Sequence, residues 1–144
     1  MIELRLDDPY NLRRFVDAQE AVYDDVCTEL KAGRKRGHWM WFIFPQIAGL
    51  GYSYAAQKFA ISSKDEAEKF LQHPVLGVRL RECAALVNSI EDRHIEDILG
   101  DIDSLKFRSS MTLFASSTTD NQVFKDALQK YFNGVSDPLT LEKI

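Results

Sequence analysis

The residues best suited to chemistry in this chain lie in one stretch, residues 34–46, named here the basic-aromatic segment. Three adjacent cations, a histidine, both tryptophans of the protein and a terminal glutamine fall within it: Arg34, Lys35, Arg36, His38, Trp39, Trp41 and Gln46. Guanidinium groups bind phosphate through paired hydrogen bonds, and lysine adds a point charge. Tryptophan rings stack on planar groups such as bases. The segment therefore predicts a site for a phosphorylated ligand with a planar ring.

A plainer interpretation of the same segment competes with this one. A run of cations after a helix end is typical of a solvated loop, where positive charge also suits the helix dipole. A short run rich in Trp, Phe and Ile, such as residues 39–44, is typical of a buried turn. The residues alone leave both interpretations open, and they identify no catalytic residue and no cofactor.

A second candidate wall is the helix predicted for residues 102–116. Lys106 and Ser110 lie four residues apart, so they share one strip of that helix and could present an ammonium and a hydroxyl to a cleft. The alternative is that this strip faces solvent. Apolar arcs on both sides predict a helix packed on two faces in the middle of the domain. The arcs consist of Phe107, Met111 and Phe114 on one side and Ile102, Leu105, Ser109 and Leu113 on the other.

The elements that position these residues are predicted to be helices. The first covers residues 9–32, and Gln19 falls inside its apolar stripe, so Gln19 is expected to point inward and to need a hydrogen-bond partner. The other helices are predicted at residues 64–73, from there to about residue 90, and at 95–99, 102–116, 119–132 and from 137 onward. Ser53 and Ser63 are expected to cap helices. Strand-like alternation between tight turns is absent, so we predict an all-α fold, a single-domain compact irregular bundle of about six to eight helices over residues 1–144.

Composition excludes several classes of function. The apolar fraction of 45% and the charged fraction of 28% are those of a globular protein, and the net charge of −4 argues against a nucleic-acid binder. The first residues lack a signal-peptide core, and no apolar run approaches the roughly 20 residues that span a bilayer. Cys27 and Cys83 are interpreted as reduced core residues, which together with the other signals predicts a cytoplasmic protein without a membrane partner.

The motifs of several enzyme and metal-site classes are missing. The three histidines, His38, His73 and His94, are scattered, and neither HExxH nor an EF-hand loop occurs, so no metal site is predicted. There is no GxSxG elbow and no Walker A motif. Residues 49–53 lack the third glycine of the dinucleotide fingerprint and are interpreted as a flexible turn. Whether the protein is an enzyme stays open.

Four stretches of the chain resemble one known family: residues 15–19 (FVDAQ), 33–51 (GRKRGHWMWFIFPQIAGLG), 71–83 (LQHPVLGVRLREC) and 106–114 (KFRSSMTLF). They are similar to the family called domain of unknown function 1810, over residues 7–141, and HWMWFIFPQ is the most specific block. The resemblance implies a mainly α-helical fold and no established activity. Members are often labelled calpastatin, but nothing in this chain looks like a protease-inhibitor repeat. Leu99 departs from the family pattern, which has phenylalanine there.

These observations together predict an uncharacterised helical protein that binds a phosphorylated small molecule beside the basic-aromatic segment. The ligand is expected to be nucleotide-like or ADP-ribose-like, the latter by a loose analogy with small helical proteins thought to act on ADP-ribose derivatives. The predicted contacts are Gln19, Arg34, Lys35, Arg36, His38, Trp39, Trp41, Gln46, Lys106 and Ser110. The alternative is a non-catalytic protein–protein interaction module that uses the same surface, with the basic loop meeting an acidic partner.

Overall fold

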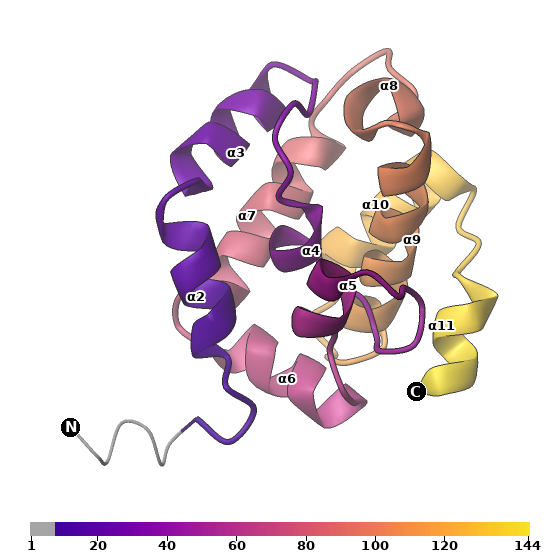
Figure 1. Ribbon diagram of the computed structural model, residues 1–144. Coiled ribbons are helices and arrows are strands. Elements are labelled where there is room, and N and C mark those ends of the chain that lie inside the picture. The colour runs from indigo at the N-terminus through magenta and orange to yellow at the C-terminus, as the bar shows by residue number, and fades with distance from the viewer. Residues whose placement is uncertain (1–7) are drawn as a thin grey trace.

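Helices are the only regular elements among residues 8–144, which are the residues that the structure, a computed structural model, describes (Figure 1). In chain order they are α2 (Arg13–Glu20), α3 (Tyr23–Lys31), α4 (Met40–Ile43), α5 (Tyr54–Lys58), α6 (Lys64–Gln72), α7 (Leu76–Asn88), α8 (Ile95–Leu99), α9 (Asp101–Ala115), α10 (Gln122–Phe132) and α11 (Pro138–Lys143). A parallel bridge joins Ile47 to Ile61 without extending into a strand. The all-α prediction is confirmed. The described residues hold more helices than expected, because the first predicted helix is divided and both α4 and α5 are very short.

The single helix predicted over residues 9–32 is wrong, because the chain breaks between α2 and α3. The N–H of Val22 donates to the carbonyl of Gln19 at 3.0 Å, which is a tighter turn than an α-helix makes. The break lets α2 pack against α4 while α3 packs against α7. Gln19 is buried as predicted: its Nε2 donates to the carbonyl of Phe42 at 2.8 Å, and Arg79 donates to its Oε1 at 3.3 Å.

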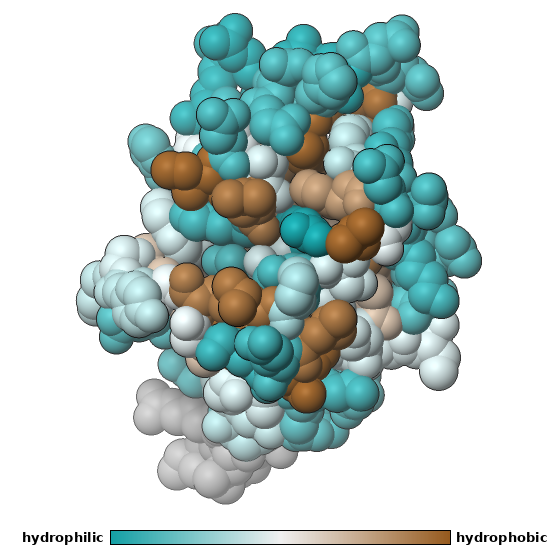
Figure 2. All heavy atoms as spheres, turned by 90° about the vertical axis from the view of Figure 1, so that its right-hand side faces the viewer, coloured by the Kyte–Doolittle hydropathy of each residue, from teal (hydrophilic) through white to brown (hydrophobic). Residues whose placement is uncertain are grey.

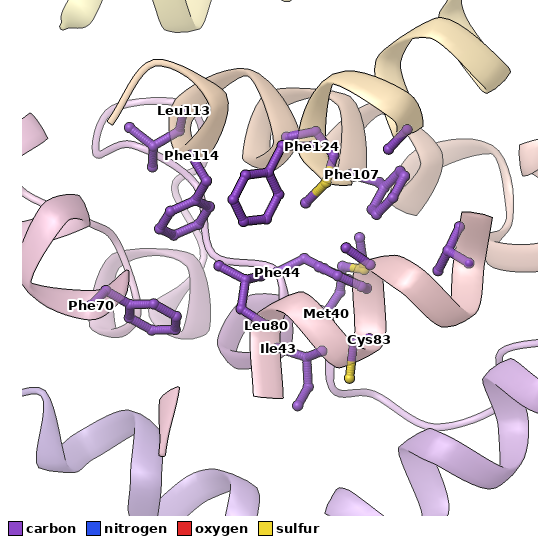
Figure 3. Close-up of a cluster of buried hydrophobic side chains, with 14 of the residues drawn as sticks. Met40, Ile43, Phe44, Phe70, Leu80, Cys83, Phe107, Leu113, Phe114 and Phe124 are labelled. Carbon is purple, nitrogen blue, oxygen red and sulfur yellow. The ribbon is translucent and has the colours of Figure 1, made fainter. Parts of the chain in front are cut away.

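The core is a cluster of buried hydrophobic side chains, phenylalanines prominent among them, gathered between α4, α6, α7, α9 and α10 (Figure 3). Phe44 meets Phe107 edge-on with ring centroids 4.9 Å apart, and Phe114 lies 5.3 Å from Phe70 and 6.0 Å from Phe124. Such pairs each add about 0.5–1.5 kcal/mol to the stabilisation that burial provides. The short helix α4 packs against α2, α7 and α9, so the backbone that carries Trp41 is fixed in the middle of the fold.

The helix α9 is packed on two sides only along part of its length. From Ser109 to Phe114 every residue is buried, as the two predicted arcs require. Nearer its start, however, Ile102 is 71% exposed and Leu105 is 63% exposed. The prediction that these two residues pack inside the domain is wrong. The physical reason is that residues 135–137 and α11 cover the second arc of α9 at Ser109 and leave its N-terminal half uncovered.

Helix caps follow the sequence closely. The hydroxyls of Ser53 and Ser63 each accept a hydrogen bond from the backbone N–H three residues later in the chain, at 3.1 Å in both cases. The carboxylate of Glu66 does not return to the N–H of Ser63, as a capping box would require. It is buried, accepts from the N–H and hydroxyl of Ser62, and pairs with Arg14 at 2.9 Å. Among residues 8–144, the helices are too short or too polar for any of them to cross a membrane.

Candidate ligand-binding site

The loop of the basic-aromatic segment is held in place by one carboxylate, that of Glu29 on α3. Its Oε1 accepts hydrogen bonds from the backbone N–H groups of Arg36 at 2.6 Å and Gly37 at 2.9 Å and from the indole Nε1 of Trp39 at 3.0 Å. Burial acts to raise the pKa of the Glu29 carboxyl, but these hydrogen bonds, with the nearby charge of Lys35, bring it below its ordinary value. The segment is therefore an ordered part of the fold.

The same loop carries Lys35 to the start of α9. Its backbone N–H donates to the carbonyl of Ile98 at 2.7 Å, and its side chain is only 8% exposed. The ammonium lies 2.8 Å from Oδ2 of Asp103 and 2.5 Å from the carbonyl oxygen of Gly37. The other oxygen of Asp103 lies 3.5 Å from the ammonium of Lys106, one turn further along α9. One carboxylate thus joins two lysines from segments far apart in the sequence.

Trp41 forms the wall beside this ion cluster. The Lys106 ammonium lies 4.8 Å from the centroid of the Trp41 ring, within the range of a cation–π interaction. The indole Nε1 of Trp41 is buried and donates to no acceptor among the described residues. A buried donor without an acceptor costs about 1–3 kcal/mol, so this N–H gains from any acceptor that reaches it.

Two cavities meet at Trp41, Ile102 and Lys106, which line both. The first, which we name the α9 cavity, has a volume of about 460 Å³ and lies at the N-terminal end of α9. Its polar and aromatic lining consists of Lys35, His38, Trp41, Asp101, Asp103 and Lys106. The second, the α11 groove, has a volume of about 470 Å³ and runs between the α4–α5 region, α9 and α11. Its lining includes Trp41, Gln46, Tyr52, Leu105, Arg108 and Leu139.

A polar cluster lies at the α11 end of the groove. The carboxylate of Asp137 accepts hydrogen bonds from the hydroxyls of Ser109 at 2.7 Å and Thr140 at 2.6 Å. Burial acts to raise the pKa of the Asp137 carboxyl. These two hydrogen bonds and the nearby guanidinium of Arg108 lower the pKa by more than burial raises it, so it lies below its ordinary value. Asp137 is therefore a charged acceptor that joins Thr140 of α11 to Ser109 of α9.

Half of the predicted site residues converge on these cavities. Lys35, His38, Trp41, Gln46 and Lys106 line one or both of them.

The other five predicted residues lie elsewhere. Arg34 and Arg36 are exposed and line neither cavity. Trp39 is buried with its indole hydrogen-bonded to Glu29, and Gln19 is a buried residue bonded to backbone and Arg79. Ser110 is fully buried in the core, so the strip predicted for Lys106 and Ser110 reaches a cavity only at Lys106. Of the three adjacent cations expected around a phosphate, only Lys35 lines the α9 cavity, together with Lys106 from α9.

Several residues of the two cavities carried no signal that the sequence interpretation used. Asp103 lies three residues before Lys106, and this spacing places a carboxylate and an ammonium on one helix face. Asp103 is therefore the missed cavity residue that the sequence could most readily have indicated. Asp137 is a single carboxylate whose importance depends on contacts with distant segments, and the same holds for Glu29, which lies outside both cavities and holds the loop. Tyr52 and Leu139 are far apart in the sequence and line the same groove only in the folded chain.

A family model described as "Protein of unknown function (DUF1810)" matches residues 9–144. The chain belongs to this family. A solved structure, the conserved hypothetical protein Rv1873 from Mycobacterium tuberculosis, is 55% identical to it, with 94% of this chain and 96% of that chain covered and a TM-score of 0.93. No curated protein matches the chain significantly. DUF1810 membership thus establishes the fold and the relationship, and the chemistry has to be argued from the two cavities.

Two other features of the DUF1810 chain bear on the choice of site. A further cavity, of about 670 Å³, lies between α2 and the end of α6, is lined by none of the ten predicted site residues, and begins at Asp8, the first described residue. Within residues 8–144, no group of three or more His, Cys, Asp or Glu side chains is placed to hold a metal ion. The α9 cavity and the α11 groove are the cavities that predicted site residues line, and the site is argued from them.

Proposed function

We propose that the protein binds a phosphorylated small molecule with a planar ring, nucleotide-like or ADP-ribose-like, in the α9 cavity beside Trp41. The observation that carries the proposal is the position of the Lys106 ammonium, which lines the cavity and lies 4.8 Å from the Trp41 ring. A phosphate offers charged acceptors to such an ammonium, and the indole offers an apolar face to a ring. A ligand with both groups is therefore recognised at both ends.

The start of α9 supports an anion in the same cavity. Its N-cap residue, Gly100, has no side chain with which to satisfy the free N–H groups of the first turn, and those N–H groups and the helix dipole favour negative charge. Asp101 and Asp103 lie in that turn and formally balance Lys35 and Lys106. Binding is consequently expected to depend on Lys106, whose contact with Asp103 is loose at 3.5 Å, more than on net charge.

Thermal unfolding with added ligands tests the proposal. ADP-ribose, NAD and adenosine mono- and diphosphate are each added at about 1 mM, with adenosine as the matched ligand that lacks phosphate. A ligand present at about one hundred times its Kd stabilises the folded protein by about 2.7 kcal/mol, which corresponds to a rise in Tm of about 9 °C for a chain of this length. We expect the phosphorylated ligands to raise the Tm and adenosine to have a much smaller effect.

Matched variants locate the binding. Lys106→Met keeps an unbranched side chain over Trp41 and removes the charge, so it is expected to weaken binding about tenfold. Arg36→Ala removes an exposed cation outside the cavity and is expected to leave binding unchanged. Trp39→Phe leaves Trp41 as the sole indole, whose fluorescence should then respond to the ligand. Absence of any stabilisation in the wild type, or equal binding by Lys106→Met, refutes the proposal.

A further inference from the structure

Exposed apolar side chains surround the α11 groove, on the face that Figure 2 presents. Tyr52 is 86% exposed and Leu139 is 56% exposed, and with Ile102 and Leu105 they line the groove. Figure 2, which views the right-hand side of Figure 1 where α9 and α11 lie, shows apolar patches on this face between hydrophilic side chains. Single exposed apolar residues are ordinary on a protein surface, but several around one groove mark an interaction site.

The charged groups around the groove are mainly positive. Lys106 and Arg108 line it, and the Lys143 ammonium lies beside Gly49, next to the groove. Arg108 donates through Nε and Nη2 to the carbonyls of Val135 and Ser136, each at 2.9 Å, which fixes its guanidinium at this place. These two bonds use two of the five N–H groups that an arginine carries.

Two carboxylates, those of Asp137 in the groove and of Asp103 beside Lys106, offset only part of the charge of the three cations. Asp137 is half-buried, and its Oδ2 already accepts hydrogen bonds from Ser109 and Thr140. The groove therefore offers apolar contacts together with cationic donors, and a complementary partner must supply an apolar side chain and a carboxylate.

We propose that the α11 groove docks a peptide segment of another protein in which a large apolar side chain lies within a few residues of an acidic one. The apolar side chain packs between Leu105 and Leu139, and the carboxylate pairs with Lys106 and Arg108. A second copy of this chain fits the groove poorly, because an isologous contact would bring the same cations against each other. This surface differs from the α9 cavity of the proposed function, and it is tested through residues that line the groove alone.

A peptide-display library selected against the whole protein is the direct test. The library is counter-selected on Leu105→Asp, which places a carboxylate at an exposed position in the groove. We expect enriched peptides to combine a Leu, Ile, Phe or Trp with an Asp or Glu at a spacing of one to three residues. Binding of an enriched peptide, measured by fluorescence anisotropy, should fall at least tenfold in Leu105→Asp. Val78→Asp is the matched control, because Val78 is an exposed apolar residue of α7 that does not line the groove.

Removing one charge at a time separates the electrostatic part of the recognition from the apolar part. Replacing the acidic residue of the peptide by its amide should weaken binding to the wild type about tenfold, and much less to Arg108→Met. Far-UV circular dichroism establishes that each variant is folded. The proposal is overturned if no peptide survives counter-selection or if the enriched peptides lack acidic residues. It is equally overturned if sedimentation shows a wild-type dimer that Leu105→Asp abolishes, or if anionic lipid vesicles bind through Leu105 while no peptide does.

Discussion

Glu29 is the residue on which the position of the basic-aromatic segment most depends, so its replacement gives the sharpest test of the site. One carboxylate oxygen accepts three hydrogen bonds, from Arg36, Gly37 and Trp39. At the low end of the range for hydrogen bonds to charged groups, about 1.5 kcal/mol each, the three would contribute about 4–5 kcal/mol. Because they share one oxygen and Glu29 is partly exposed, we expect Glu29→Ala to lower the free energy of unfolding by about half of that, roughly 2 kcal/mol.

The pH dependence of this loss has a definite sign. The pKa of the Glu29 carboxyl is lower in the folded protein than in the unfolded chain. Its contribution to stability is therefore fully present above the unfolded pKa, near 4.3, and is lost as the pH falls through the folded pKa. The difference between wild type and Glu29→Gln, which removes only the charge, is expected to be largest at neutral pH and to shrink in acid.

Urea unfolding followed by circular dichroism measures these differences at about pH 7 and about pH 3. Hydrogen exchange of the Arg36 and Gly37 amides reports on the loop itself, because both donate to Glu29. The expected loss at neutral pH corresponds to a fall in Tm of about 7 °C for Glu29→Ala. Glu96→Gln, at an exposed position in α8, is the control. If Glu29→Ala costs no more than Glu96→Gln, or if amide protection is unchanged, the proposed role of Glu29 is refuted.

Three further predictions concern the surrounding fold. The first concerns two glycines, whose alanine variants are compared by urea unfolding. Gly77→Ala should lower the free energy of unfolding by about 3 kcal/mol or prevent folding, because its Cβ would lie 2.1 Å from the backbone oxygen of Leu71, which cannot move aside. Gly100→Ala should lower it by about 2 kcal/mol from backbone strain alone, because φ there is +94° and nothing lies within 4 Å. The Cys83 thiol, whose pKa is raised to about 12 chiefly by burial, should not react with an aromatic disulfide in folded Cys27→Ser, but should react fully in urea. Asp137→Asn should lower stability by about 1–2 kcal/mol at neutral pH and by less in acid, since the pKa of Asp137 is depressed; equal losses at both pH values would contradict this.

Much of the fold was predictable because it is encoded locally. The seam of Leu76, Leu80, Cys83 and Val87 places α7 in the core through spacing alone. The caps at Ser53 and Ser63 likewise depend on residues three positions away. The break at Val22 was not predictable, because helix propensity continues through it and the division is imposed by packing of α2 and α3 on different partners.

The candidate site was only half predictable for a related reason. Trp39 and Trp41 are two residues apart and chemically identical, yet one is buried against Glu29 while the other lines both cavities. Their separation follows from the turn that starts α4, which the sequence left ambiguous. The exposure of Ile102 and Leu105 could not be predicted either. The sequence of an apolar arc looks the same whether another helix of the fold covers the arc or leaves it exposed.

Lys106 connects the two proposals, since its single ammonium lines both the α9 cavity and the α11 groove. A phosphate in the cavity and a carboxylate in the groove would compete for it, so each ligand should weaken the binding of the other by the same factor. Titrating an acidic peptide with and without a saturating phosphorylated ligand measures this factor. We expect a peptide affinity about tenfold lower in the presence of the ligand, and no such difference in Lys106→Met. Identical peptide affinities in wild type with and without bound ligand would show that Lys106 serves at most one of the two sites.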